Sequence, residues 1–206
     1  MDSENKDPSG LRLNLGCGFK KKPGFVNVDI NSGCMPDVCL DLTKETWPWA
    51  DCSVDEVEFD FSLEEMGSGP QDLLRVLKET YRVCKPGARV FIRWRHPRHD
   101  RFLMNPLCVQ RISPQFLSLL SVQRCLDLIA NGEFDTPLAL YLGVNFLIRD
   151  AQYLLDIRHK EALESGGKTE EELRQRMMFE NNICEVMEVE LVTLKREGRE
   201  DEKPSP

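Results

Sequence analysis

Two glycines and an aspartate follow two short apolar runs near the N-terminus. Gly16-Cys17-Gly18 comes directly after the run LRLNL, and Asp29 lies near the end of the next run, FVNVDI. If the two runs are parallel strands, the glycines let a ligand approach the backbone closely, and Asp29 can accept hydrogen bonds from both hydroxyls of a ribose. The types and spacing of these residues therefore predict a nucleoside-binding site.

A nicotinamide dinucleotide is one ligand of such sites, and its binding loop normally carries a third glycine. This chain has Lys21 at the corresponding position. Without that glycine, the close packing of helix and strand that accompanies a pyrophosphate loop is not provided. A nicotinamide cofactor is therefore disfavoured, although an oxidoreductase is kept as an alternative.

A second group of reactive side chains lies between positions 93 and 101, in the segment RWRHPRHDR. In the functional interpretation, Arg95 and Arg98 bind an anionic substrate, and His96 or His99 acts as a general base. In the alternative interpretation, this is a solvated loop whose arginines pair with the many acidic residues of the chain. The sequence favours neither interpretation.

Glu64 is a further candidate acid or base, because it is paired with Glu65 just after the fourth apolar run. A carboxylate with a raised pKa can move a proton in catalysis. Two glutamates at the start of a helix also interact favourably with the helix dipole, without any catalytic role. Both interpretations stay open.

Composition limits the protein classes to consider. The chain has 206 residues, 41% of them hydrophobic, and a net charge of −8. This size predicts one domain, and the acidic balance argues against a nucleic-acid partner or an anionic membrane surface. No apolar run reaches the roughly 18 to 20 residues of a membrane span, and the first residues do not resemble a secretion signal. We therefore expect a cytoplasmic protein without a membrane partner.

Eight cysteines are present, and no two of them form a C-x-x-C pair. Structural zinc sites usually contain at least one such pair, so no metal site is predicted. Cytosolic cysteines also stay reduced. We expect most of these thiols to be small buried side chains.

The elements that must position these residues follow from the pattern of apolar residues. Short strands are predicted at 11–15, 25–30, 37–42, 54–61 and 88–94, with a returning strand from Ile183 to Leu194. Helices are predicted from Pro70 to the Lys85-Pro86-Gly87 turn, from Ser113 to about 130, from Phe146 to Leu163, and after a capping box of Thr169 and Glu172. The order of strands and helices predicts an α/β domain at 11–196 with a helical insertion at about 95–180. The polar ends, 1–10 and 197–206, are predicted to be disordered tails.

Four segments resemble a known family when they are taken in order. LNLGCG and NVDI resemble motifs I and II of the class I S-adenosylmethionine-dependent methyltransferases. DLTKETWPWADCSVDEVEF and LLRVLKETYRVCKPGARVFIRW are similar to later segments of that family, so the likeness covers about 11–94. NNICEVMEVELVTLKR resembles the last strand of a small bacterial branch of type 11 methyltransferases. The resemblance implies a Rossmann-like fold, a mostly parallel twisted sheet with helices on both faces.

The resemblance also implies a cofactor, S-adenosylmethionine, and the residues that would contact it. The first strand and its turn would line the methionine and ribose portions, Asp29 would bind the ribose hydroxyls, and Asp41 would face the adenine amino group. The complete set is Leu15, Gly16, Cys17, Gly18, Asp29, Ile30, Asp41, Leu42 and Phe61. The implied activity is methyl transfer to an unidentified acceptor, small or macromolecular, for which the arginine loop favours an anion.

Two departures from the family pattern affect these expectations. The related branch usually carries a His-x-Leu-Glu-His stretch where this chain has Phe61-Ser62-Leu63-Glu64-Glu65. The alternative function is therefore a methyltransferase-like module that binds the cofactor or a partner without transferring methyl groups. The connection at 16–24 is also shorter than a parallel crossover normally needs, which predicts that the first helix is vestigial.

Overall fold

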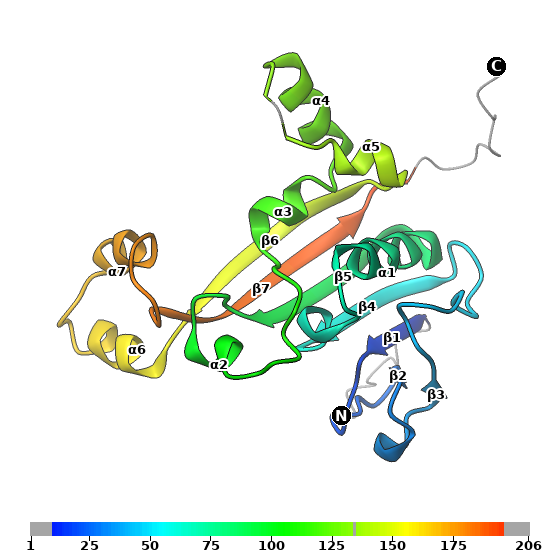
Figure 1. The fold of residues 1–206 in the computed structure, drawn as a ribbon, viewed down its shortest axis with the longest axis horizontal. Helices are drawn as coiled ribbons and strands as arrows, with labels where there is room; N and C mark the ends of the chain where they lie inside the picture. The colour runs from blue at the N-terminus through cyan, green and yellow to red at the C-terminus, as the bar shows by residue number, and fades with distance from the viewer. Residues whose placement is uncertain (1–9, 134, 196–206) are drawn as a thin grey trace, which may run out of the picture.

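Among the residues that the structure describes, seven strands form one open sheet in the order β3-β2-β1-β4-β5-β7-β6 (Figure 1). The computed structural model describes residues 10–133 and 135–195. The strands are β1 Leu11–Leu15, β2 Val26–Asp29, β3 Val38–Cys39, β4 Val54–Asp60, β5 Cys84–Arg95, β6 Phe146–Leu155 and β7 Cys184–Thr193. All neighbouring pairs from β3 to β5 are parallel, whereas β7 is antiparallel to both β5 and β6. The predicted Rossmann-like, mostly parallel sheet is confirmed.

The strand order reverses direction at β1. From β1 the chain continues to β2 and β3 on one side, and it then returns to place β4 and β5 on the other side. The carboxyl ends of β1 and β4 are therefore adjacent at a topological switch point, which is where open α/β sheets bind ligands. The short connection between β1 and β2 contains no helix, as its length predicts.

Seven α-helices and two short 3-10 helices are found in the described residues. They are η1 Ser32–Cys34, η2 Leu63–Glu65, α1 Pro70–Val83, α2 Asp100–Leu103, α3 Pro114–Ser118, α4 Val122–Ala130, α5 Leu138–Leu142, α6 Ile157–Glu164 and α7 Glu170–Met177. α1 begins at Pro70 as predicted, and α7 follows the predicted capping box of Thr169 and Glu172. None of these helices has the length and apolar character needed to cross a membrane.

The helix predicted from Ser113 to about 130 is divided into α3 and α4. Ser113 accepts a hydrogen bond from the backbone of Phe116, and Pro114 begins α3, as expected for an N-cap followed by proline. Ser121 then accepts from the backbone of Arg124 and caps α4. Ser121 is thus a second capping serine within the predicted helix, and it starts a new one.

The helix predicted from Phe146 to Leu163 is wrong over most of its length. Phe146–Leu155 forms β6, which pairs with β7 in an antiparallel register from Phe146↔Thr193 to Leu155↔Cys184, and only Ile157–Glu164 is helical. The segment mixes strand-favouring residues, Phe146, Ile148 and Tyr153, with leucine, arginine, alanine and glutamine, which favour helix. Pairing with β7 decides between the two structures. The predicted helical insertion is therefore interrupted by an edge strand of the sheet.

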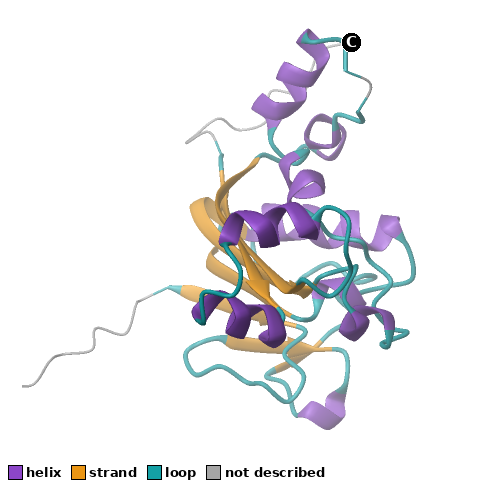
Figure 2. Cartoon of the chain, turned by 90° about the vertical axis from the view of Figure 1, so that its left-hand side faces the viewer, coloured by secondary structure: helices purple, strands orange, loops and turns teal. Residues whose placement is uncertain are grey.

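Side chains on the two faces of the sheet differ sharply. Val57, Phe59, Val90, Ile92 and Trp94 are buried on the face covered by α1 and α3. In Figure 2, the helices that pack on the sheet lie to one side of it. On the opposite face, ion pairs join neighbouring strands: Arg89 with Glu56, Arg93 with Asp60 and Glu188, and Arg149 with Glu190.

The expectation of helices on both faces is therefore not met in the described part of the chain. The connections that follow β1 and β2 contain only turns and the short η1, so they supply no helix to cover the second face. That face carries charged pairs in place of a helix layer. As for the predicted tails, all but Gly10 of 1–10, and all of 197–206, lie outside the described residues.

Candidate functional site

The glycine turn lies at the carboxyl end of β1 and is bonded to β2. The backbone amides of Gly16 and Cys17 both donate to the carbonyl oxygen of Val28, at 2.8 and 3.0 Å. The amide of Gly18 donates to Oδ2 of Asp29 at 2.7 Å. The structure thus brings the predicted glycines and the predicted acid together at the switch point of the sheet.

Glycine is required at position 16 and at position 18 for different structural reasons. Gly16 has a φ of +71°, and a Cβ there would lie 2.4 Å from the Cβ of Ser62, whose hydroxyl donates to the carbonyl oxygen of Leu15. Gly18 has a φ of +48°, and a Cβ there would meet nothing within 4 Å. Gly16 therefore lets β1 pack closely against the start of η2. The space beside Gly18 is open to a ligand.

Replacing Gly16 by Ala should destabilise the protein more than replacing Gly87. Gly87 has a nearly equal φ of +75°, but a Cβ at this position would have no neighbour within 4 Å. Both variants carry the cost of a left-handed residue, about 1 to 2 kcal/mol, and only Gly16→Ala adds overpacking, about 1 to 3 kcal/mol. Urea denaturation of the two variants measures the difference. Equal losses of stability would show that Ser62 moves aside freely.

Asp29 keeps capacity for a further ligand. Its Oδ1 accepts the amide of Asn31 at 2.8 Å and its Oδ2 accepts that of Gly18, so each oxygen retains a lone pair. The next residue, Ile30, is 65% exposed, which is unusual for an isoleucine and leaves an apolar surface beside the carboxylate. These features suit a ribose with an attached flat base.

The other predicted cofactor residues have defined positions around this turn. Leu15 and Cys17 are buried, and burial, together with the charge of Asp29, raises the pKa of the Cys17 thiol. The amide of Leu40 donates to the carbonyl oxygen of Asp29 at 3.0 Å, which holds the segment after β3 beside the site.

Asp41 and Leu42 follow in that segment and are engaged in a local turn. Asp41 accepts from the hydroxyl of Thr43 at 2.6 Å and pairs with Lys44, and the Thr43 hydrogen bond is the main cause of its lowered pKa. The carbonyl oxygen of the buried Leu42 accepts from Nε1 of Trp47. The structure thus places both residues near Asp29, with the carboxylate of Asp41 committed to the turn.

Phe61 lies directly after β4 in a conformation that is rare for a bulky residue. Its φ is +57°, and its ring is approached by Lys20, Arg93 and Arg95 at 5.3, 5.9 and 5.0 Å from the centroid. Strained residues of this kind concentrate at functional sites. The ring connects the glycine turn, which carries Lys20, with the end of β5, which carries Arg95.

Beyond Phe61 lies an acid cluster formed by Glu64, Glu65, Arg95 and Asn105. Nη1 of Arg95 donates to both carboxylates at 3.0 Å, and Nδ2 of Asn105 donates to Glu65 at 2.7 Å. Glu64 is completely buried, and among the described residues its Oε2 has no hydrogen-bond partner. Burial raises the pKa of Glu64 to about 7. Glu64 can therefore exchange a proton near neutral pH.

The acid cluster also bears on the predictions for Arg95 and for metals. Arg95 is occupied by two carboxylates, so it positions Glu64 and does not present a free guanidinium to a substrate. One ligand atom each of Glu64, Glu65 and Cys108 lies within 4.8 Å of the others. The guanidinium of Arg95 already contacts both carboxylates and offsets part of their negative charge, which disfavours a metal cation there.

The side chain of His99 is buried and engaged in contacts that connect two helices. It is 4% exposed, its Nδ1 accepts the amide of Arg101 at 3.1 Å, and its Nε2 lies 3.0 Å from Oδ2 of Asp156. It caps α2 and connects this helix to the start of α6. Both ring nitrogens are occupied, so His99 could act as a base only by giving up one of these contacts.

His96 and Arg98 lie on the wall of a separate cavity. Arg98 donates to the carbonyl oxygen of Met178 at 2.8 Å, so it holds the end of α7. Nδ1 of His96 accepts the amide of Arg98 at 3.2 Å, which leaves Nε2 as the protonated nitrogen of the neutral ring. Burial, followed by the charge of Arg98, lowers the pKa of His96. This environment favours the neutral form of the ring.

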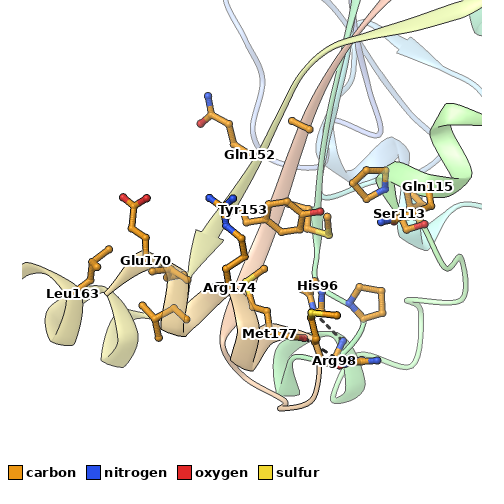
Figure 3. A pocket seen from close by; sticks show the side chains of 18 residues that line it. His96, Arg98, Ser113, Gln115, Gln152, Tyr153, Leu163, Glu170, Arg174 and Met177 are labelled. Atoms are coloured by element: carbon orange, nitrogen blue, oxygen red, sulfur yellow. Dashed lines mark hydrogen bonds between the residues drawn. The ribbon is translucent and has the colours of Figure 1, made fainter. Parts of the chain in front are cut away.

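The cavity has a volume of about 940 Å³ and lies between the ends of β6 and β7, α7 and the segment before α3 (Figure 3). Its lining includes Tyr153, Arg174, Met177 and Met187. None of these four residues was among the predicted site residues. Tyr153 lay in a segment predicted to be helical, and nothing in the sequence of α7 indicates which part of the sheet it covers.

Solved structures resemble this fold, although no protein-family profile and no curated protein sequence matches the chain. A SAM-dependent methyltransferase from Archaeoglobus fulgidus aligns with a TM-score of 0.60 and 18% identity, over 90% of this chain and 87% of that one. The YcgJ protein from Bacillus subtilis aligns at 0.52 and 12% identity, over 91% and 93%. The [4+2]-cyclase SpnF aligns at 0.53 and 14% identity, over 91% and 76%.

At these identities the likeness concerns the fold, and the cyclase shows that proteins of this shape differ in activity. The strand order, the antiparallel β7 and the switch-point turn are all present in the described chain. The chain has the Rossmann-like fold of the class I S-adenosylmethionine-dependent methyltransferases.

Proposed function

We propose that this protein binds S-adenosylmethionine and transfers its methyl group to an acceptor bound near Phe61 and Glu64. The observation that carries the proposal is the glycine turn, bonded to Asp29 at the switch point between β1 and β4. Open α/β sheets bind nucleoside ligands at this place.

The residues around the turn fit this cofactor. The remaining lone pairs of Asp29 suit ribose hydroxyls, the exposed Ile30 suits a flat base, and the open space at Gly18 admits the ligand. The residues that would hold the cofactor are Leu15, Gly16, Cys17, Gly18, Asp29, Ile30, Asp41, Leu42 and Phe61. For Asp41, contact with the adenine amino group would be in addition to its bond with Thr43.

The chemical demands on the protein are modest. Bound S-adenosylmethionine supplies a methyl group that its sulfonium already activates. The chain must align a nucleophile with that methyl group and exclude water. If the nucleophile carries a proton, Glu64 is the candidate acceptor for it, because its pKa of about 7 leaves a large fraction ionised at neutral pH. Glu64 is completely buried, so its carboxylate would have to become accessible to the nucleophile. Arg95 keeps this carboxylate in position.

The alternative is a methyltransferase-like module that binds the cofactor or a partner without transfer. The absence of the two histidines around Glu64 motivates this alternative. Formation of S-adenosylhomocysteine from S-adenosylmethionine, with small-molecule extracts as the source of acceptor, separates the two functions. We further propose a cytoplasmic location, which is supported by the eight free cysteines of the described chain.

Titration calorimetry tests the proposed cofactor directly. S-adenosylmethionine and S-adenosylhomocysteine should each bind the purified protein at one site, and NADH should not bind. Binding of NADH without binding of S-adenosylmethionine would contradict the proposal and favour the oxidoreductase alternative.

A further inference from the structure

We propose that the cavity of about 940 Å³ beside His96 binds the methyl acceptor, and that this acceptor is a small molecule with an apolar body and a carboxylate group. The identification of the ligand as the acceptor rests on the proposed function. Its chemical class rests on the cavity alone.

The apolar character of the ligand follows from the lining. Ile112, Tyr153, Leu173, Met177 and Met187 contribute to the walls, and the volume is within the range of sites that bind small molecules, about 300 to 1,000 Å³. The flexible and polarisable side chains of methionine adapt to ligands of irregular shape. A largely apolar molecule gains free energy by leaving water for this lining.

The charge of the ligand follows from Arg174. This residue lines the cavity, and in Figure 3 its side chain extends from α7 into the space beside Tyr153. Within residues 10–133 and 135–195, Arg174 forms no hydrogen bond or ion pair, whereas Arg98, which also lines the cavity, is bonded to carbonyl oxygens at the end of α7. A guanidinium without a partner can bind a carboxylate through two parallel hydrogen bonds. The other charged lining residues are Arg98 and Glu170, so the arginines outnumber the acids in the lining and favour an anionic ligand.

Two walls of the cavity continue into the acid cluster. His96 directly follows Arg95, which is bonded to Glu64. The other wall contains Ile112, whose carbonyl oxygen accepts from Nε1 of Trp94, and two residues earlier the amide of Gln110 donates to the carbonyl oxygen of Glu64. The cavity is therefore lined by segments whose neighbouring residues contact Glu64 and Phe61, where the methyl group is proposed to lie.

Octanoate is a suitable probe, with octylamine as a probe of equal chain length and opposite charge. We expect octanoate to bind the full-length protein at one site and octylamine to bind at least tenfold more weakly. Arg174→Met should reduce octanoate affinity about tenfold, because a hydrogen-bonded charged pair contributes about 1.5 kcal/mol or more. Arg75→Met is the matched control, since Arg75 is an exposed arginine on α1, outside the cavity lining.

Methyl-labelled methionine gives a local readout by NMR. Octanoate should shift the signals of Met177 and Met187, which line the cavity, and leave that of Met35, which is exposed after η1. Failure of octanoate to bind, equal affinity of the two arginine variants, or shifts confined to Met35 would each overturn the inference.

Parallel titration with S-adenosylmethionine separates this inference from the proposed function. Binding of S-adenosylmethionine without binding of octanoate would overturn the inference alone. Binding of octanoate without binding of S-adenosylmethionine would support the cavity as an anion site and overturn both the proposed function and the role of the ligand as methyl acceptor.

Discussion

Asp29→Ala is expected to weaken S-adenosylmethionine binding by a factor of about 100 or more. In the proposed complex, the carboxylate of Asp29 accepts both ribose hydroxyls, and hydrogen bonds to a charged group contribute about 1.5 to 3 kcal/mol each. The substitution also removes the acceptor for the amide of Gly18, so the turn loses its attachment to the end of β2. Both effects act in the same direction, and titration calorimetry measures their sum.

Asp37→Ala is the control for the structural part of this effect. Asp37 also accepts a backbone amide, that of Asn27 at 2.8 Å, but it precedes β3 and so lies away from the carboxyl edge of the sheet. It should therefore lower stability and preserve cofactor affinity. An unchanged dissociation constant for Asp29→Ala would place the ribose elsewhere and remove the main support for the proposed function.

The glycine turn and Asp29 could be predicted because they depend on local sequence. The glycines directly follow β1 and Asp29 is the last residue of β2, so the correct order of strands was enough to bring them together at one edge. The same holds for α1 and α7, whose starts are determined by Pro70 and by the Thr169 capping box. Features of the fold that depend on a few neighbouring residues were therefore predicted correctly.

β6 and the open face of the sheet depend on partners that are distant in the chain. Pairing between Phe146 and Thr193 decides that the segment is a strand, and no local pattern indicates this pairing. The open face, in contrast, had a usable pattern. Strands buried on both faces are nearly continuous in apolar residues, whereas VDEVEFD and CEVMEVELVT alternate with acids. That alternation indicates one covered face.

The segment at 93–101, which is rich in arginine and histidine, shows why residue types alone did not define the acceptor site. Its composition suggested a substrate anchor, but Arg95 is bonded to Glu64, 31 positions away, and His99 contacts Asp156, 57 positions away. Glu64 neutralises Arg95, and Asp156 orients His99, so neither residue is free to contact a substrate. Arg174 remains available because no acid of the described chain lies within bonding distance of it.

Glu64→Gln is expected to become more stable relative to the wild type as the pH rises from 5 to 8. Burial raises the pKa of Glu64 from 4.5 to about 7, so between these values the folded protein holds a proton that the unfolded chain has released. Stability then falls with rising pH, and the cost approaches about 3 kcal/mol above pH 7. Glutamine does not titrate, so it avoids this cost. Urea denaturation of both proteins at pH 5 and pH 8 measures the change.

Glu65→Gln is the matched control, because Glu65 shares Arg95 but its side chain is 29% exposed and remains in contact with water. Its effect on stability should vary less with pH. If the two variants follow the same pH dependence, the burial of Glu64 does not govern its protonation, and its assignment as a base near neutral pH loses its physical reason. If only Glu64→Gln shows the trend, the wild type retains a carboxylate that destabilises its fold above pH 7. A side chain that destabilises the fold is expected to be retained at a position, such as this one near Phe61, where proton transfer and not folding stability decides which residue is present.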